Sequence, residues 1–206
     1  MSARLASPRR RRYRRGMSKL LVVAGSTRTG AFSKQLAQAA AALARSGGHE
    51  ATFVDLRDFA MPLYDGDLEA AQGLPEGAVR LRGLVAPHDA LLIVTPEYNA
   101  SLPAVLKNAL DWLSRPHGQE AGGVVFRGKV AAMMSSSPGA LGGMRALVHL
   151  RQVLMNLGVL VVTEQFALGN AGAAFQADGS LVDGKQAAAA NAVVQRLLQV
   201  ATRLGG

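Results

Sequence analysis

The sequence predicts an α/β fold, in which one five-stranded parallel sheet is doubly wound and carries helices on both faces. Two observations predict it. Five short apolar runs alternate with segments of helical periodicity along the 206 residues. Each run is apolar at consecutive positions rather than at every second one, which is typical of strands buried on both faces of a parallel sheet. Five strands and five helices in a chain of this length predict a doubly wound sheet of strand order 2-1-3-4-5, with right-handed crossovers.

The five predicted strands are short and rich in Val, Leu and Ile, and turn-forming residues flank them. They are KLLVVAG at 19–25, ATFVDL at 51–56, ALLIVT at 90–95, KVAAMMSSS at 129–137 and GVLVVT at 158–163. After the second strand comes MPLYDGDLEAAQGLPEG (61–77), which holds too much Pro and Gly to be one element.

Helices are predicted where apolar residues recur three and four positions apart. The clearest stripe follows the third strand, and comprises Leu102, Val105, Leu106, Ala109, Leu110 and Leu113. The other helices are expected from Phe32 to near Gly47, around 76–86, from about Gly143 to Leu157, and from Lys185 to Leu204.

Composition limits the class of protein. Apolar residues make up 49% of the chain, yet no run of eighteen apolar residues occurs, so a membrane-spanning helix is not expected. Cysteine is absent, which excludes disulfides, thiolate metal sites and a cysteine nucleophile and fits a cytoplasmic location.

The formal charge of +9 is mostly local. Residues 1–16 hold seven arginines and no acid, which leaves 16 basic and 14 acidic residues elsewhere. We expect a disordered Arg-rich N-terminal extension at 1–16, with Met17 as a possible working start, and a single domain at 17–206. The alternative is an arm that binds nucleic acid or an anionic surface.

Ligands of doubly wound sheets bind beyond the carboxyl ends of the strands, where the winding reverses. This rule points to three turns, at 25–33, 95–101 and 135–143, all rich in Gly, Ser, Thr or Asn. In the first, several hydroxyls surround Arg28 just before a helix start, which favours a phosphate. Simple helix capping would by itself explain Ser33.

The first turn matches neither of the common nucleotide-binding motifs. Ala31 and Phe32 stand where a Walker loop requires Lys and Ser or Thr, and the Gly-x-Gly-x-x-Gly fingerprint is absent. A single phosphate, as on a mononucleotide, therefore fits this turn better than a pyrophosphate.

The other two turns offer backbone and small side chains. Pro96 and Pro103 stiffen the second turn, so that Tyr98 or Asn99 can lie beside a planar ligand. Equally, Tyr98 can be a partly buried aromatic in a proline-bracketed connection. In the third turn, glycines (Gly139, Gly142 and Gly143) allow a backbone to approach a ligand closely.

Other chemistries find little support. The histidines lack metal-site spacing and are expected at the surface or as caps: His49, His88, His117 and His149. No Gly-x-Ser-x-Gly elbow accompanies the serines. Asp65, Asp67 and Glu69 are expected to form a solvated acidic turn rather than a calcium loop. Core packing is expected of Trp112, Met133 and Met134. We assign no metal ligand and no catalytic side chain.

Four segments together resemble the NADPH-dependent FMN reductase family, and most closely its chromate/quinone reductase and azoreductase branch. They are GSTRTGAFSKQLA, PLYDGDLE, VTPEYNASLPAVLKNALDWLSRP and SSSPGALGGMRALVHLRQVL. The resemblance runs from about Ser18 to the final helix and leaves out the Arg-rich extension.

The resemblance implies a flavodoxin-like fold that holds FMN non-covalently. It implies that the FMN phosphate contacts Ser26, Arg28 and Ser33. It implies that the isoalloxazine ring lies along Pro96, Glu97, Tyr98 and Asn99, with Ser135, Ser136, Ser137 and Gly139 on the other side of the flavin. The chain departs from the family at Ala31-Phe32-Ser33, where Ser-Phe-Asn is common, and in a longer loop between Arg115 and Lys129.

The resemblance also implies an enzyme that passes hydride from NADPH or NADH through FMN to quinones, azo dyes, metal oxyanions such as chromate, or free flavin. Such a cycle needs no side-chain acid or nucleophile. The alternative is a flavodoxin-type electron carrier without NAD(P)H activity; flavodoxins are usually acidic, whereas this core is slightly basic. Relatives commonly form homodimers or homotetramers, and segment 61–64 and helix 147–157 are candidate contacts.

Overall fold

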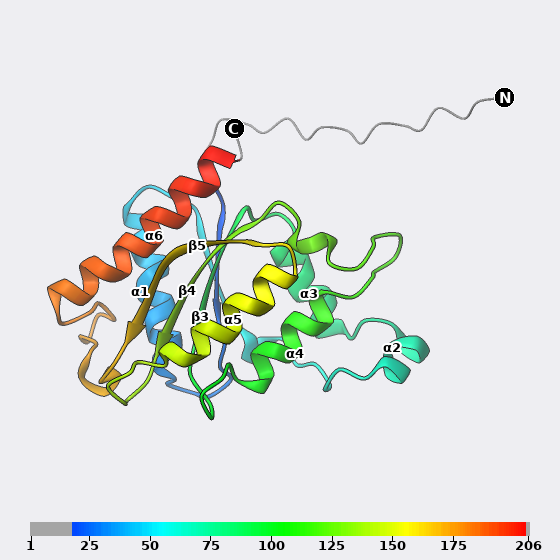
Figure 1. Ribbon diagram of the computed structural model, residues 1–206, viewed down its shortest axis with the longest axis horizontal. Coiled ribbons are helices and arrows are strands. Elements are labelled where there is room, and N and C mark those ends of the chain that lie inside the picture. Colours follow the sequence, from blue (N-terminus) through cyan, green and yellow to red (C-terminus); the bar gives the residue numbers. More distant parts are fainter. Residues whose placement is uncertain (1–17, 205–206) are drawn as a thin grey trace.

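The computed structural model describes residues 18–204 and contains the predicted sheet (Figure 1). All five strands are parallel, and their order, β2-β1-β3-β4-β5, confirms the prediction. The strands are β1 (Leu20–Ala24), β2 (Ala51–Asp55), β3 (Ala90–Thr95), β4 (Val130–Ser136) and β5 (Leu160–Leu168).

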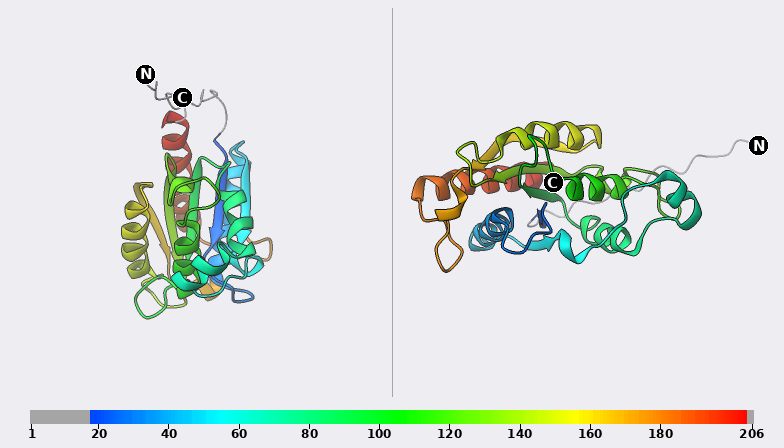
Figure 2. Two further views of the ribbon diagram at one scale, coloured as in Figure 1. Left: turned by 90° about the vertical axis from the view of Figure 1, so that its right-hand side faces the viewer. Right: turned by 90° about the horizontal axis from the view of Figure 1, so that it is seen from below.

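Helices cover both faces of the sheet, so the molecule has three layers (Figure 2). The longer helices are α1 (Phe32–Ser46), α3 (Glu76–Val85), α4 (Ala104–Leu113), α5 (Met144–Asn156) and α6 (Gly184–Leu204). Helices α1 and α6 pack together on one face, and α3, α4 and α5 lie on the other. Four short helices complete the described chain: η1 (Leu56–Asp58), α2 (Gly66–Gln72), η2 (Val124–Phe126) and η3 (Ala171–Ala173).

Each central strand serves two hydrophobic cores, because successive side chains point to opposite faces. In β1, Leu20 and Val22 join the core beneath α1 and α6, whereas Leu21 and Val23 join the core beneath the other three helices. This explains why the strands are apolar at consecutive positions. Met133 and Met134 are fully buried on opposite sides of β4, as predicted.

Strand β5 departs most from the prediction, which placed it at 158–163. It begins at Leu160 and continues to Leu168. It is the edge strand, and its outer positions are exposed or half-buried, so Thr163, Glu164 and Gln165 interrupt the apolar run without ending the strand. An edge strand buries less surface and needs no continuous apolar sequence.

The segment after β2 is held by polar side chains of α4. Trp112 Nε1 and Asn108 Nδ2 each donate a hydrogen bond to the Pro62 carbonyl at 2.8 Å. Asn108 Oδ1 accepts from the Tyr64 amide at 2.8 Å, and the Tyr64 ring meets Trp112 edge-on. Trp112 is fully buried, which confirms the prediction that it packs.

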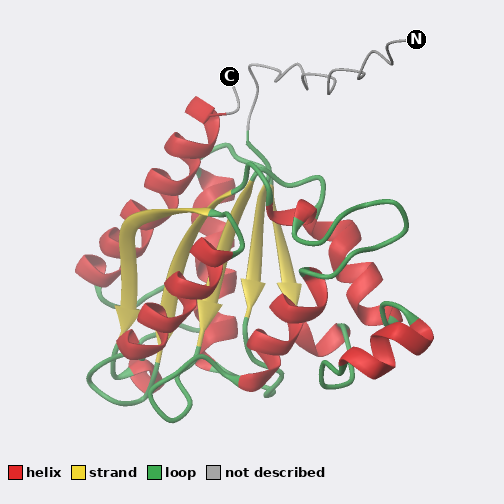
Figure 3. Ribbon diagram, turned by 45° about the vertical axis from the view of Figure 1, so that its right-hand side comes forward, coloured by secondary structure: helices red, strands yellow, loops and turns green. Residues whose placement is uncertain are grey.

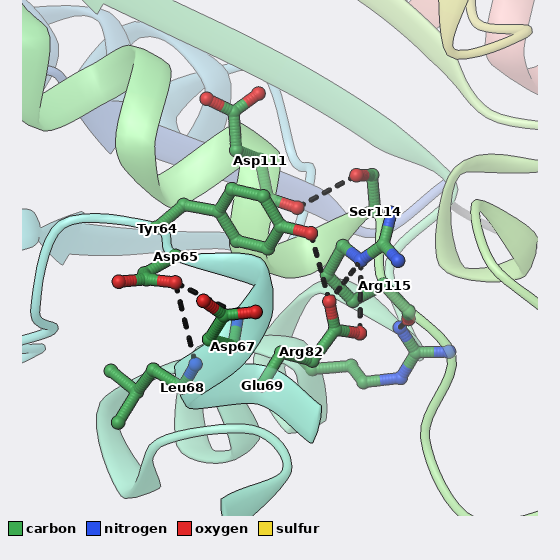
Figure 4. A network of polar contacts seen from close by, with 9 residues as sticks. All are labelled: Tyr64, Asp65, Asp67, Leu68, Glu69, Arg82, Asp111, Ser114 and Arg115. Atoms are coloured by element: carbon green, nitrogen blue, oxygen red, sulfur yellow. Dashed lines mark hydrogen bonds and ion pairs between the residues drawn. The ribbon is translucent and has the colours of Figure 1, made fainter. Parts of the chain in front are cut away.

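The predicted acidic turn at 65–69 is wrong in part, as Figure 4 shows. Asp65 caps the short helix α2 by accepting from the Asp67 and Leu68 amides. Glu69 accepts from Tyr64 Oη at 2.9 Å and from Arg115 Nε at 2.8 Å. The hydrogen bond from Arg115 lowers the pKa of Glu69. Because Arg115 lies 46 positions along the chain from Glu69, the local sequence does not reveal this partner.

No helix within residues 18–204 is long and apolar enough to span a bilayer. The expectations of a disordered extension at 1–16 and of nucleic-acid contact by that arm lie outside the described residues.

Candidate functional site

The three predicted turns meet at the carboxyl edge of the sheet, toward which the arrowheads point in Figure 3. A cavity of about 280 Å³ lies among them. Its lining comes from all three turns: Ser26, Arg28, Ala31, Phe32, Ser33, Pro96, Glu97, Tyr98, Ser136, Ser137 and Pro138. Segments more than a hundred residues apart in the sequence thus form one concave surface.

Most of the predicted site residues line this cavity. Asn99, Ser135 and Gly139 do not, although each neighbours a residue that does. Ala31, Phe32 and Pro138 also line the cavity and were not predicted from the sequence. The Arg28 guanidinium lies 5.8 Å from the centre of the Phe32 ring. Phe32 was assigned to the apolar stripe of a helix, and its place in the first helical turn is the one signal that pointed to the cavity.

Helix α1 begins at the cavity without a side-chain cap. Its N-cap residue is Ala31, and its first turn carries no acidic residue. The alternative that Ser33 serves as the cap is therefore wrong. Ser33 Oγ is buried and has no hydrogen-bond partner in the described structure. An uncapped helix start and an unused hydroxyl suit an anion, because the first amides of a helix lack intrahelical partners and carry partial positive charge.

The second turn is a tight two-residue reversal. The Tyr98 amide donates a hydrogen bond to the Ser101 carbonyl at 2.9 Å, and the Ser101 amide donates to the Tyr98 carbonyl at 3.0 Å. Asn99 and Ala100 between them have φ of 49° and 63°, the left-handed region. Asn tolerates this conformation, but Ala pays a steric cost of about 1–2 kcal/mol. The reversal leaves the Tyr98 side chain half exposed at the cavity, as expected of a partly buried aromatic, and its place beside a ligand stays a prediction.

The Glu97 carboxylate joins the second turn to the start of α5. It accepts from the Arg145 amide at 3.0 Å and from Arg145 Nε at 2.8 Å, and Arg145 Nη2 forms an ion pair with it. The Ala146 amide is a further donor. Glu97 therefore caps α5 from 48 positions away.

This position affects the ionisation of Glu97. Burial by itself would raise the pKa, but the hydrogen bonds and charge of Arg145, together with the two amides, outweigh it and hold the pKa of Glu97 below its ordinary value. The carboxylate is thus charged, and both of its oxygens are bonded to protein groups.

The third turn contributes hydroxyls from the end of β4. Ser135 Oγ and Ser136 Oγ are buried, and neither has a partner among residues 18–204. Buried hydroxyls without partners cost free energy, so they are natural points for contact with a ligand or water.

Two glycines of this turn pack closely against neighbouring segments, and their approach to a ligand stays a prediction. A Cβ on Gly142 would lie 2.7 Å from the Gly169 nitrogen, and one on Gly143 would lie 3.2 Å from Ser135 Cβ. The turn therefore depends on close contact with the end of β5.

No group of three His, Cys, Asp or Glu residues within 18–204 could hold a metal ion. The histidines were predicted to lie at the surface or to act as caps, and His88 is a buried cap: one ring nitrogen bonds the Leu84 carbonyl in the last turn of α3, and the other bonds Thr52 Oγ1. The cavity thus combines a helix start, an arginine and hydroxyls without partners with apolar lining residues such as Phe32 and Pro138.

Comparison with known proteins gives one consistent result. The family model for NADPH-dependent FMN reductase matches residues 18–173. A 2-hydroxy-1,4-benzoquinone reductase of a Burkholderia species is 45% identical over 146 residues, which cover 71% of this chain and 75% of that protein. An NAD(P)H-dependent FMN reductase of Pseudomonas aeruginosa is 39% identical over 183 residues, covering 88% and 91%. Among solved structures, a flavoenzyme NAD(P)H:(acceptor) oxidoreductase from Paracoccus denitrificans gives a TM-score of 0.78 at 31% identity, covering 91% of this chain and 98% of that one.

Proposed function

Because the chain belongs to the NADPH-dependent FMN reductase family, we propose that it holds FMN in the cavity between the three turns and reduces a small quinone with NAD(P)H. The chain is an oxidoreductase of this family, with FMN and NAD(P)H as its cofactors. The observation that carries the proposed site is the meeting of three turns around a cavity at an uncapped helix start.

The first turn fits the phosphate of FMN. Ser33 Oγ is unused within the described chain, and the amides at the start of α1 offer further donors. The Arg28 guanidinium can donate two parallel hydrogen bonds to phosphate oxygens. Ser26 Oγ accepts from the Arg28 amide at 3.2 Å and so shapes the turn from within. We assign Ser26, Arg28 and Ser33 to the phosphate.

The second and third turns fit the flavin ring. Pro96, Glu97, Tyr98 and Asn99 supply one edge, and Glu97 does so without its carboxylate, which α5 occupies. Ser135, Ser136, Ser137 and Gly139 are assigned to the other side. When bound, FMN supplies reversible two-electron redox chemistry. The protein binds and orients it, and we assign no side chain to proton transfer.

A quinone is proposed as the acceptor because the similar proteins include a hydroxybenzoquinone reductase and several quinone reductases, among them one of Escherichia coli at 35% identity over 73% of this chain. Azo dyes, chromate and free flavin are secondary candidates. An electron carrier without NAD(P)H activity is disfavoured by family membership.

Titration and reduction of the purified protein test this function. The apoprotein should quench FMN fluorescence with about one-to-one stoichiometry, and NADPH should bleach the visible flavin band within one turnover under anaerobic conditions. Addition of 1,4-benzoquinone should then restore the band. FMN that binds but is not bleached by NADPH or NADH would exclude a reductase in favour of an electron carrier.

Removing the phosphate contacts should weaken FMN binding, and the loss should be larger for a charged side chain than for a neutral one. Arg28→Met is expected to raise the Kd of FMN by about 10–100-fold, because it removes charge-assisted hydrogen bonds, and Ser33→Ala by about 2–10-fold. The measurement is fluorescence titration. Arg203→Met, at an exposed arginine in the last turn of α6, is the matched control and should leave the Kd unchanged. Equal affinities for Arg28→Met and the wild type would contradict the assignment.

We further propose that two copies of the chain associate through the outer face of α5. Met144, Val148 and Met155 lie on one side of this helix, and Val148 and Met155 are 65% and 62% exposed. Leu63 is also exposed, whereas Leu147, Leu150 and Leu154 are buried in the core. The candidate helix is thus retained, with its outward residues as the expected contacts and its leucines in the core.

Charge on this face should separate the copies. Val148→Asp is expected to convert a dimer into a monomer, because it buries an unpaired carboxylate at the contact. Gel filtration with light scattering measures the mass. Ala192→Asp, on an exposed position of α6, is the control and should leave the dimer intact. A wild type that is monomeric at micromolar concentration would refute the association.

A further inference from the structure

Asp55, the last residue of β2, holds two different partners beside the first turn. Its Oδ2 lies 2.7 Å from Lys34 Nζ, and its Oδ1 accepts from the Arg57 amide at 2.9 Å. Lys34 follows Ser33 in the first turn of α1, and Arg57 lies in the short helix η1. The carboxylate therefore connects the start of α1 to the chain that leaves β2.

Arg57 extends this connection to the turn itself. Its Nη1 donates to Thr29 Oγ1, in the middle of the turn that precedes α1. The turn is thereby fastened at two points, at Thr29 through Arg57 and at Lys34 through Asp55. These are side-chain contacts from another strand, and they surround the residues assigned to the FMN phosphate.

Burial makes the Lys34–Asp55 pair a fixed part of the turn. The two side chains are only 10% and 20% exposed, so water replaces their contact poorly. The charges of the pair do not by themselves favour an anion at this helix start. The Asp55 carboxylate would repel the anion, and the Lys34 cation near the helix start opposes the helix dipole. Its contribution to phosphate binding is therefore geometric rather than a matter of charge.

We propose that Asp55 is a positioning residue for the phosphate turn, acting through Lys34 and through Arg57 and Thr29. The proposal rests on the FMN site proposed above. The expected change in phosphate affinity has the opposite sign to the change expected from charge alone. Removal of the carboxylate charge would strengthen phosphate binding by electrostatics, whereas loss of the contacts that hold the turn weakens it.

The test compares FMN with riboflavin, which has the same ring but lacks the phosphate. Fluorescence titration gives both Kd values for the wild type and three variants, Asp55→Asn, Arg57→Met and the control Asp58→Asn. Asp55→Asn should raise the Kd of FMN about tenfold and that of riboflavin less than about twofold, as expected for misplaced hydrogen-bond donors. Arg57→Met should change the Kd of FMN in the same direction by about threefold. Asp58 is exposed in η1, and its variant should match the wild type.

The outcomes separate this proposal from the function on which it rests. If the wild type binds FMN and riboflavin equally, the phosphate assignment itself fails. If the wild type prefers FMN and both Asp55→Asn and Arg57→Met keep that preference, or Asp55→Asn binds FMN more tightly, the positioning role is overturned. If Asp55→Asn does not fold because Lys34 loses its partner, the exposed Arg57→Met decides, and an unchanged ratio of the two Kd values then overturns the proposal.

Discussion

Gly142→Ala is expected to destabilise the protein by about 3 kcal/mol or more. Two costs combine at this position. Its φ of 61° lies in the left-handed region, which costs an alanine about 1–2 kcal/mol. The added Cβ would also lie 2.7 Å from the Gly169 nitrogen and 2.7 Å from the Leu168 carbonyl carbon, and these backbone atoms move only if the end of β5 moves. Urea denaturation followed by circular dichroism measures the loss.

A second glycine isolates the steric part of this effect. Gly158 has a φ of 78°, but a Cβ there would meet nothing within 4 Å. Gly158→Ala should therefore cost only the conformational strain, about 1–2 kcal/mol. Similar losses for both variants would show that the contact between the third turn and β5 relaxes freely. Gly142→Ala should also weaken FMN binding, because the turn that it displaces carries Ser136 and Ser137.

Arg145→Met is expected to destabilise the protein by about 2 kcal/mol at neutral pH. It leaves the Glu97 carboxylate, only 8% exposed, with amide donors but without its cation. Breaking a fully buried pair costs about 3–5 kcal/mol. The expected loss is smaller here because Arg145 is 58% exposed and water already screens its charge. Thermal or urea unfolding at several pH values measures the effect.

The pH dependence provides an independent check. In the wild type the folded-state pKa of Glu97 lies below its unfolded value, so the stabilisation is complete above the unfolded pKa and is lost as the pH falls through the folded pKa. Without Arg145 the burial that raises this pKa is opposed only by the amides. The difference between wild type and variant should therefore be largest above about pH 5 and shrink toward pH 3.

An exposed ion pair serves as the control for Arg145→Met. Lys107 pairs with Asp111 one turn away on α4, and both side chains are more than a third exposed. Lys107→Met should cost no more than about 0.5 kcal/mol, with little dependence on pH. If Arg145→Met behaved like Lys107→Met, the cap on α5 would not depend on the ion pair.

The amino-acid pattern alone was enough to predict the layers of this protein. Strands such as β1 must be apolar at consecutive positions because Leu20 and Leu21 enter different cores, and this requirement is visible in any single segment. The order of the sheet was predicted from five strands that alternate with five helices in a chain of this length, and the order in turn indicated which turns meet. That is why Ser26, Pro96 and Ser136 could be grouped before their positions were known.

The partners of individual polar side chains were decided only by the tertiary structure. Glu97 caps a helix 48 residues away, Glu69 pairs with Arg115, and His88 is buried between Leu84 and Thr52. A local pattern records whether a position is buried, but a hydrogen bond depends on distances between segments that the sequence does not bring together. The same reason explains the glycines: Gly142 looks like a flexible turn residue in the sequence, and only its approach to the backbone at Leu168 and Gly169 shows that a side chain has no room there.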